Sequence, residues 1–528
     1  MMLARRRGRY PNLAVKFLII GLVERHFRHR ARMTGLSGEK FDVLVIGGGI
    51  TGCGVARDAA MRGLTVALFE RDDFASGTSG RSSRLVHGGI RYLEQGRLHL
   101  VHESIRERQT LLRIAPHLVR PLAFTWPIYR DARVGRLKLS AGLLAYYLMA
   151  IGRSRRHHTL SAAETIAREP SLRRAALTGG AVYYDACTDD ARLTVANAIA
   201  AREAGATVIN HTRVHKLLVE GGKAVGAVVS PTLSGESYEV RARIIVNATG
   251  VWEREFEADP GTRAHRGSKG VHISVPRERI GNRDALTLIS PIDGRVMFCL
   301  PAGPQAIVGT TDTWTDDSPE TVHASADDLD YLIRSANAYF PEARLTPADV
   351  VSAWAGIRPL ASAAAANPGA VSREHSIVTG SAGVITVAGG KLTTYRSMAA
   401  EVVDLVQRAL GQKRKHSHTD SVELPGGDRP RKIAALQATD ESLARPLVES
   451  LPYSGAHLVY AVQSEMAQTL SDLLIRRTHL AFETRDHGLS VASRAAEIVG
   501  PLLSWTEETK AARIREYSKD VGRMFAIS

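Results

Sequence analysis

Cysteine is scarce in this chain of 528 residues, which contains only Cys53, Cys187 and Cys299. So few cysteines exclude a disulfide-built scaffold and are typical of a reducing compartment. No C-x-x-C pair occurs, so we expect no cysteine-built zinc site and predict no metal ligands. Hydrophobic residues make up 44% of the chain and charged residues 23%, which excludes a mainly disordered chain or a fibre.

The sequence also lacks a hydrophobic run long enough to cross a bilayer, which takes about 20 apolar residues. The two candidates, Leu13–Val23 and Leu139–Ile151, have 11 and 13 residues. The second is either an ordinary buried helix or a helix that lies on a membrane, where its basic flanks meet anionic head groups. These flanks are Arg133, Arg136, Lys138, Arg153, Arg155 and Arg156. We therefore expect any membrane contact to be peripheral.

Acidic residues are too few to balance the basic ones, since 69 Lys and Arg against 54 Asp and Glu leave a net charge of +15. Residues 1–40 alone hold ten basic and two acidic residues. This basic extension is a surface anchor, an Arg-rich presequence, or an extension without function upstream of Met33. Nucleic acid, an anionic membrane and a phosphorylated substrate are all compatible with the charge. We disfavour nucleic acid because the rest of the sequence has no basic patch or binding motif.

Residues 41–70 have the order of a dinucleotide-binding unit. The apolar strand at 41–46 runs into a G-x-G-x-x-G turn formed by Gly47, Gly49 and Gly52, and a helix and a second strand ending at Glu70 follow. The glycines allow a tight turn close to a pyrophosphate, which the N–H groups of the helix N-terminus bind. Glu70 lies 18 residues after Gly52, in place to accept hydrogen bonds from ribose hydroxyls, and it disfavours NADP.

Three further segments favour FAD over NAD. The loop after Glu70 is rich in small hydroxyl side chains and arginine, which suits a surface that wraps a long cofactor; its candidate cofactor ligands are Ser76, Thr78, Ser79 and Arg84. A tight turn at Thr249 and Gly250 follows a strand, and another turn with Gly390, Leu392 and Thr393 precedes a helix. That helix N-terminus can stabilise negative charge on a reduced ring. Each turn alone is compatible with a simple connector, but the ordered set favours FAD.

Specific motifs recur along residues 41–520: VIGGGITG (45–52), HGGIRYLE (87–94), NATGVW (247–252), KGVHI (269–273), AGIRPL (355–360), SREHSI (372–377) and GGKLTTYR (389–396). Together they closely resemble the FAD-dependent, respiratory (quinone-linked) glycerol-3-phosphate dehydrogenases of the D-amino-acid-oxidase-like flavoprotein class. No EF-hand loop pattern of the mitochondrial branch occurs, so the resemblance points to the bacterial type.

The resemblance implies an activity and partners. The expected reaction is oxidation of sn-glycerol 3-phosphate to dihydroxyacetone phosphate, with hydride passing to FAD and electrons to membrane quinone. An oxidase that uses oxygen is the close alternative. An amine or amino-acid oxidase is disfavoured, because the expected site has more Arg and Lys residues than are needed to bind a single substrate carboxylate. We expect a cytoplasmic enzyme bound peripherally to the inner face of the cell membrane, and a homodimer is a further possibility.

The resemblance also implies the site residues. A phosphate dianion needs fixed cations, and we assign substrate binding to Arg91, Tyr92, Arg373 and Lys391. The catalytic candidates are His87, His272 and Arg358. Arg358 is expected to bind the anion and to polarise the C2 oxygen. The base is His87 or His272, because an imidazole titrates near neutral pH.

The predicted fold class is α/β: a Rossmann-like FAD-binding domain with an inserted β-rich substrate domain and a C-terminal helical domain. The expected FAD-dependent oxidoreductase core is 41–410, with FAD-binding parts at about 41–130, 181–255 and 355–410 and a substrate-side cap at about 256–354. A polar linker at 411–430 and a helical domain at 431–528 are expected to follow.

Overall fold

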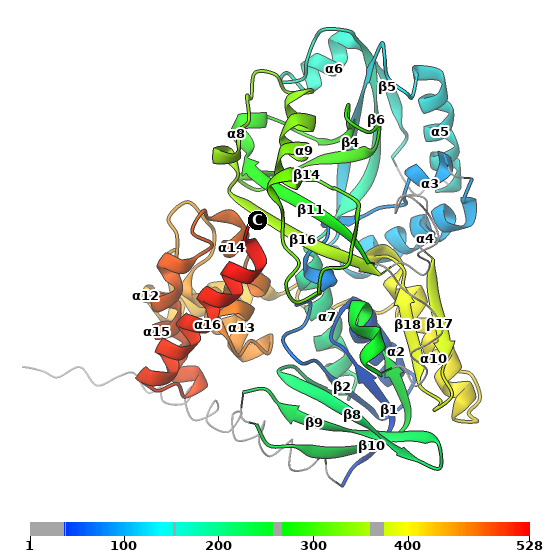
Figure 1. Ribbon diagram of the computed structural model, residues 1–528, viewed down its shortest axis with the longest axis vertical. Helices are drawn as coiled ribbons and strands as arrows, with labels where there is room; N and C mark the ends of the chain where they lie inside the picture. The colour runs from blue at the N-terminus through cyan, green and yellow to red at the C-terminus, as the bar shows by residue number, and fades with distance from the viewer. Residues whose placement is uncertain are drawn as a thin grey trace, which may run out of the picture.

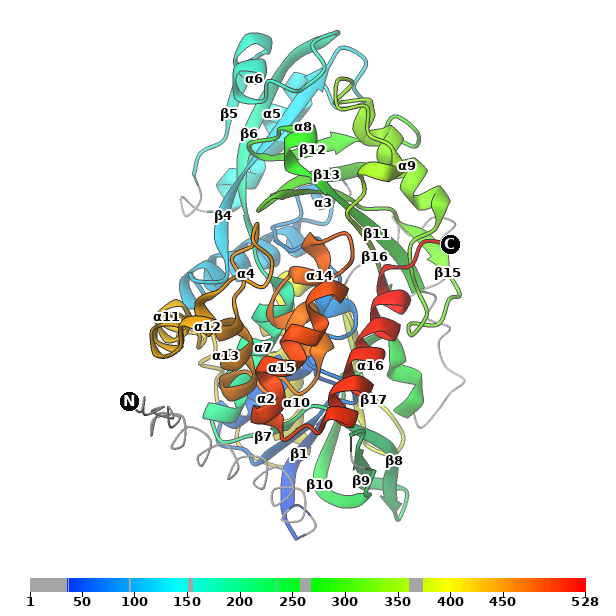
Figure 2. The ribbon, with the colours of Figure 1, turned by 90° about the vertical axis from the view of Figure 1, so that its left-hand side faces the viewer.

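The computed structural model describes residues 36, 38–94, 96–150, 155–233, 235–256, 267–359 and 374–528. Two sheets follow one another along the long axis of the molecule, and the C-terminal helices lie on one side of both (Figures 1 and 2). Nearly all of the basic extension and Arg373 lie outside the described residues, as does the side chain of Arg91.

The first sheet is built around β1 (Lys40–Ile46), which pairs in parallel with β10 (Tyr238–Asn247) and β2 (Val66–Phe69). β7 (Thr207–Ile209) and β18 (Ile385–Gly389) extend the parallel part. The antiparallel additions are β17 (His375–Thr379), β8 (Thr212–Glu220) and β9 (Lys223–Pro231). The second half of β1, residues 43–46, is a continuous apolar and buried run because both faces of this sheet are covered.

Three helices cover one face of this sheet: α2 (Ile50–Met61), α7 (Asp190–Glu203) and α10 (Tyr395–Ala409) (Figure 1). Their apolar side chains form one core with those of β1, for example Val45, Ala59 and Val402. The other face packs against the layer formed by β8 and β9. The helix and strand order therefore brings the carboxyl ends of β1, β10 and β18 to one edge, where ligands bind in folds of this kind.

The second sheet has ten strands in the order β15-β11-β14-β13-β12-β4-β6-β3, with β16 beside β11 and β5 beside β6. The bounds of its strands are β3 Leu85–Val86, β4 Arg120–Tyr129, β5 His158–Ser161, β6 Leu177–Cys187, β11 Gly267–Pro276, β12 Ala285–Ile289, β13 Val296–Ala302, β14 Gln305–Gly309, β15 Thr313–Thr315 and β16 Ser352–Pro359. The helices associated with it are α3 (Arg91–Glu94), α4 (Leu98–Ile114), α5 (Arg136–Met149), α6 (Ala162–Arg168), α8 (Arg277–Ile280) and α9 (Ala326–Asn337).

The sheets divide the chain differently from the predicted boundaries. The parts at 41–130, 181–255 and 355–410 were expected to form the FAD-binding domain, but β4 in the first part, and β6 and β16, which extend into the other two, belong to the second sheet. The reason is that an apolar strand pattern identifies a strand without identifying its partner. Pairing depends on hydrogen bonds to segments that are distant in sequence.

The C-terminal region is helical, as predicted. It comprises α11 (Arg429–Thr439), α12 (Glu441–Ala444), α13 (Gly455–Ser464), the π-helical turn η6 (Asp472–Arg477), α14 (Leu480–Glu483), α15 (Ala492–Leu503) and α16 (Glu507–Phe525). Its buried side chains, such as Leu473, Ala495 and Phe482, share a core with Trp354 of β16. Among the described helices, none is long and apolar enough to cross a membrane. The mixed fold with two sheets and a helical C-terminal region agrees with the predicted fold class.

Candidate active site

A cavity of about 360 Å³ lies between the edge of the first sheet and the second sheet, which covers it. Most of the predicted site residues line it: Gly47, Gly49, Glu70, Ser76, Thr78, Ser79, His87, Tyr92, Thr249, Gly250, His272, Arg358, Gly390, Lys391, Leu392 and Thr393. Segments separated by hundreds of residues thus meet around one space.

The glycine turn forms the phosphate-binding end of the cavity. Helix α2 begins after Gly49, which has no side chain to cap it, and the N–H of its first residue, Ile50, donates a hydrogen bond to Ser79 Oγ at 3.0 Å. Gly47 has a φ of +105°, which favours glycine, and a Cβ at Gly52 would lie 1.9 Å from the carbonyl oxygen of Gly47. Gly52 therefore supports the turn from beneath and does not line the cavity. A helix N-terminus that begins at a glycine turn, beside the hydroxyl of Ser79, fits a pyrophosphate.

Glu70 ends β2 and holds the turn and the following loop together. Its Oε2 accepts a hydrogen bond from the backbone N–H of Gly48 at 2.6 Å, and its Oε1 accepts one from the N–H of Asp72 at 2.9 Å. Burial, and next the charge of Asp72, raises the pKa of the Glu70 carboxyl to about 7. This acid is therefore placed where the sequence predicts a ribose-binding carboxylate, and the residues present fit FAD.

Arg84, a predicted cofactor ligand, is not among the residues that line the cavity. Its guanidinium lies over the ring of Phe482, 4.8 Å from the centroid, and over that of Trp354 at 5.6 Å. Its backbone has a φ of 56°, so the chain turns sharply at this residue. Arg84 thus contacts the C-terminal region, a contact that spacing along the sequence does not reveal.

Arg358 presents a cation to the cavity from β16. Its Nη2 donates a hydrogen bond to Thr310 Oγ1 at 3.0 Å, and its Nη1 lies 3.3 Å from the carboxylate of Asp312. Gly270 of β11 faces the guanidinium so closely that a Cβ there would lie 2.3 Å from Nη2. An anchored guanidinium of this kind can bind a phosphate or polarise an oxygen.

Lys391 supplies a second cation to the same cavity. Its Nζ lies 4.1 Å from the centroid of the Tyr92 ring and donates a hydrogen bond to Ser104 Oγ at 3.2 Å. The ring face of Tyr92 attracts the ammonium group and so helps to place it. The structure thereby brings two predicted cations, Arg358 and Lys391, to one space, while the side chains of Arg91 and Arg373 are outside the described part of the chain.

His272 is buried on β11. Its ring stacks on that of Trp354, with centroids 5.4 Å apart and an interplanar angle of 12°, and its Nε2 lies 2.8 Å from Ser83 Oγ. Burial, with the nearby charges of Arg358 and Arg84, lowers the pKa of His272 to about 3. The imidazole is therefore neutral at physiological pH and a weak proton acceptor.

His87 lines the cavity from the loop after β3. Its backbone N–H donates to Thr393 Oγ1 at 3.2 Å, and its ring lies edge-on to Phe298 with centroids 6.5 Å apart. This hydrogen bond joins the two predicted motifs HGGIRYLE and GGKLTTYR across the cavity.

Asp185 of β6 also lines the cavity, and the sequence analysis missed it. It accepts a hydrogen bond from the N–H of Gly88 at 3.1 Å and one from the hydroxyl of Tyr146 at 2.7 Å, and it pairs with Arg108. A Cβ at Gly88 would lie 2.3 Å from the Tyr146 hydroxyl oxygen. The sequence does contain a sign of the importance of Asp185. This residue lies near the end of the apolar strand LTGGAVYYDAC, and an ionisable group in a buried strand needs a partner.

Comparison with known proteins agrees with this geometry. A family model described as FAD dependent oxidoreductase matches residues 42–396, and one described as the C-terminal domain of alpha-glycerophosphate oxidase matches residues 425–510. This chain belongs to the FAD-dependent oxidoreductase family. FAD as the cofactor and a flavoprotein oxidoreductase as the enzyme class are thereby confirmed.

Relatives within the family are similar over nearly the whole chain. Glycerol-3-phosphate dehydrogenase 2 of Mycobacterium tuberculosis is 39% identical, covering 89% of this chain and 86% of its own. The aerobic glycerol-3-phosphate dehydrogenase of Staphylococcus saprophyticus is 36% identical, covering 91% of this chain and 94% of its own. The X-ray structure of the glycerol-3-phosphate dehydrogenase from Bacillus halodurans complexed with FAD superposes with a TM-score of 0.75 at 30% identity, covering 94% of this chain and 98% of that one. The chain therefore lies among the FAD-dependent glycerol-3-phosphate dehydrogenases.

Proposed function

We propose that this enzyme oxidises sn-glycerol 3-phosphate to dihydroxyacetone phosphate. The observation that carries the proposal is the pair of anchored cations, Arg358 and Lys391, in a cavity whose other end fits the pyrophosphate of FAD. A phosphate dianion needs such fixed cations, whereas an amino-acid substrate needs a clamp for a single carboxylate charge. The names of the similar enzymes support the same substrate.

The side chains of the cavity have separable roles in this reaction. When bound, FAD supplies the acceptor for the hydride that leaves C2 of the substrate. Arg358 and Lys391 hold the phosphate and the oxygens of the substrate in place. His87 accepts the proton of the C2 hydroxyl, because the pKa of His272 at about 3 makes that imidazole a poor acceptor. His272 instead presents a neutral ring that is fixed by Trp354 and Ser83.

Bleaching of the flavin absorbance tests the substrate. The purified holoenzyme, kept free of oxygen, is expected to lose its yellow colour when sn-glycerol 3-phosphate is added and to keep it with glycerol, which lacks the phosphate. Arg358→Ala is expected to retain FAD but to lose this bleaching at the same substrate concentration. A holoenzyme that stays yellow with saturating glycerol 3-phosphate would overturn the proposal.

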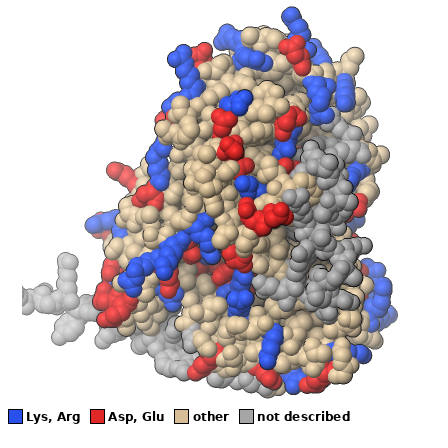
Figure 3. Space-filling view, viewed as in Figure 1, with Lys and Arg blue, Asp and Glu red and all other residues tan. Residues whose placement is uncertain are grey.

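We also propose that the enzyme meets a membrane through α5 and passes its electrons to a quinone there. One face of α5 is buried, at Leu139, Leu143 and Tyr146. Its other face exposes Leu137, Leu144 and Leu148 to solvent, at 88%, 45% and 63% of their surface. Exposed basic residues lie on α5 and on either side of it in the sequence, namely Arg133, Arg136, Lys138, Arg155 and Arg156. Figure 3 shows Lys and Arg at the edge where Figure 1 places α5. Apolar and cationic groups on one surface helix fit an anionic lipid surface.

Binding to vesicles tests this surface. The protein is expected to sediment with anionic vesicles at low salt and to be released as salt is raised. Leu148→Glu is expected to weaken the binding, whereas the control Val219→Glu, an equally exposed position on β8 with 55% of its surface accessible, is not. Quinone reduction in the presence of vesicles should exceed oxygen consumption; the reverse would favour the oxidase alternative.

A further inference from the structure

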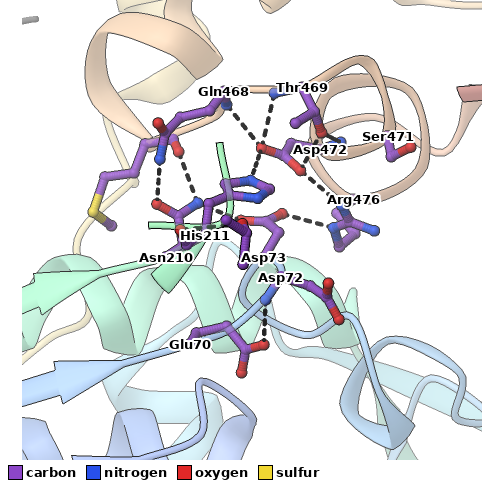
Figure 4. Close-up of polar contacts among 12 residues, drawn as sticks. Glu70, Asp72, Asp73, Asn210, His211, Gln468, Thr469, Ser471, Asp472 and Arg476 are labelled. Carbon is purple, nitrogen blue, oxygen red and sulfur yellow. Dashed lines mark hydrogen bonds and ion pairs between the residues drawn. The ribbon is translucent and has the colours of Figure 1, made fainter. Parts of the chain in front are cut away.

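A buried group of charged side chains joins the C-terminal region to the loop that follows Glu70 (Figure 4). Asp73 in this loop is fully buried. Its carboxylate accepts hydrogen bonds from Arg477 Nη1 and Nη2 at 2.7 and 2.9 Å and from Arg476 Nε at 2.6 Å. Asn210 Nδ2 donates a further hydrogen bond at 2.9 Å. Burial alone would raise the pKa of Asp73, but the two arginines outweigh it and hold the pKa below its usual value.

A second carboxylate, that of Asp472, extends the group within η6. It accepts a hydrogen bond from Arg476 Nη2 at 2.7 Å and from the N–H of Gln468 at 2.7 Å. His211 Nε2 lies 2.9 Å away and donates to it. Burial lowers the pKa of His211, but the charge of Asp472 outweighs that effect and the pKa is raised. Two carboxylates and an imidazole in such proximity resemble a metal site, but both carboxylates are paired with guanidinium groups, which repel a cation.

The same group is continuous with the ribose-binding end of the cavity. The backbone N–H of His211 donates to the carbonyl of Asp72 at 2.6 Å, and that of Thr212 donates to the carbonyl of Glu70 at 2.7 Å. The N–H of Ser76 donates to the carbonyl of Asp73 at 3.0 Å. The loop that bears Asp73 therefore begins at the carboxylate that holds the glycine turn and continues into the cavity-lining hydroxyl residues 76–79.

We propose that Arg476 and Arg477 are positioning residues for FAD. They act through Asp73: by neutralising its buried charge they keep the loop at 70–79 in the conformation that binds the ribose end of the cofactor. Without them the carboxylate of Asp73 loses its compensation in a site closed to water, so the loop must open to solvate it. An opened loop displaces Glu70 and the hydroxyl groups that line the cavity. The C-terminal region is thereby part of the cofactor site without touching the cavity at these residues.

Titration of FAD into apoprotein variants tests the proposal independently of the substrate. Arg477→Met is expected to weaken FAD binding at least tenfold. The less disruptive Arg476→Gln is expected to weaken it at least threefold. Arg476→Lys, which keeps the charge, should recover part of the affinity. The matched control is His479→Gln, which removes a 2.7 Å contact between the C-terminal region and Asp189, the N-cap residue of α7, without touching the loop. This control is expected to lower the melting temperature and leave the Kd for FAD within twofold of the parent.

A purely structural role would lower the melting temperatures of the apo and holo forms equally and leave the Kd for FAD unchanged. The positioning role instead predicts that excess FAD restores both kcat and the parent KM for substrate in Arg476→Gln. If Arg477→Met does not fold, the Kd for FAD of Arg476→Gln alone tests the proposal. A parent-like Kd for FAD in Arg476→Gln, or an equal loss in His479→Gln, would overturn the proposal. FAD binding is measured without substrate. A failure of this proposal can therefore be distinguished from a failure of the proposal that glycerol 3-phosphate is the substrate.

Discussion

The backbone N–H of Gly88 donates a hydrogen bond to the carboxylate of Asp185 across 3.1 Å. This bond fixes the loop of His87 to β6 of the second sheet. Asp185 is itself held by Arg108 and by the hydroxyl of Tyr146 on α5. The position of the proposed base therefore depends on a carboxylate that lies 97 residues after the neighbouring Gly88 in the sequence.

Asp185→Asn is expected to lower kcat by about ten- to a hundredfold while FAD stays bound, because a small displacement of a catalytic group has effects of this order. The amide keeps the shape of the side chain but loses the charge that pairs with Arg108. Steady-state kinetics together with the flavin content of the purified protein check this. Tyr146→Phe, which removes one of the three contacts, should have a smaller effect in the same direction. An unchanged kcat in Asp185→Asn would contradict the positioning of His87 by this carboxylate.

FAD affinity is expected to rise as the pH increases through about 7. The pKa of Glu70 in the apoprotein is about 7 because of burial, and ribose hydroxyls donate to its ionised form, so FAD binding favours loss of the proton. The stability of the apoprotein changes with pH in the opposite direction. The contribution of Glu70 to its free energy of unfolding is fully present below the usual pKa of 4.5 and is lost as the pH rises through about 7. Titrations between pH 6 and 8 test this. Glu70→Gln should remove the pH dependence, and a persistent slope would contradict the assignment.

Gly52→Ala is expected to yield protein that lacks FAD and unfolds at a lower temperature, because the new Cβ would lie 1.9 Å from the backbone oxygen of Gly47. Backbone atoms cannot move aside as a flexible side chain can. The control is Gly142→Ala in α5, where the added methyl group meets open space. Alanine there should stabilise the helix by about 0.5–1 kcal/mol. Flavin absorbance and thermal unfolding distinguish the two, and a flavin-replete Gly52→Ala protein would exclude the predicted turn geometry.

Gly270→Ala is expected to raise the KM for glycerol 3-phosphate by about tenfold, since a single well-placed charged contact is worth on this order. The methyl group would lie 2.3 Å from the flexible guanidinium of Arg358, which must move away from Thr310 and Asp312. FAD content should be unchanged, because the glycine turn follows β1 of the first sheet, whereas Gly270 lies on β11 of the second. Arg358→Lys should give a similar rise in KM. Kinetics that match the parent enzyme in Gly270→Ala would contradict an anion-binding role for Arg358.

Local patterns in the sequence predicted many of the residues that line the cavity. The turn with Gly47, Gly49 and Gly52, and Glu70 after it, were identified because strand, turn, helix and acid follow within about thirty residues. The turn at Gly390, Leu392 and Thr393 was identified for the same reason and lines the same cavity. Motif resemblance added His87, Arg358 and Lys391, which the structure brings together there.

Other features depend on contacts that no local pattern contains. Arg84 was expected among the cofactor ligands, and in the structure it lies over Phe482, outside the cavity lining. The pairing of β4 and β6 in the second sheet was not predicted. His272 was one of the two candidates for the base, but its burial beside Arg358 lowers the pKa of its imidazole to about 3. Asp185 was missed because its importance lies in the three groups that reach it from separate elements.

The sequence by itself determined the nucleotide-binding unit, the cofactor and the family, because these depend on backbone turns and on side chains at short, regular spacings. The tertiary structure alone decided which charges are neutralised and how. Asp73 pairs with Arg477 across 404 residues of chain, and the pKa of each buried group follows from neighbours that only folding brings near. Burial makes these pairings energetically decisive, since a charge removed from water must find its partner inside the protein.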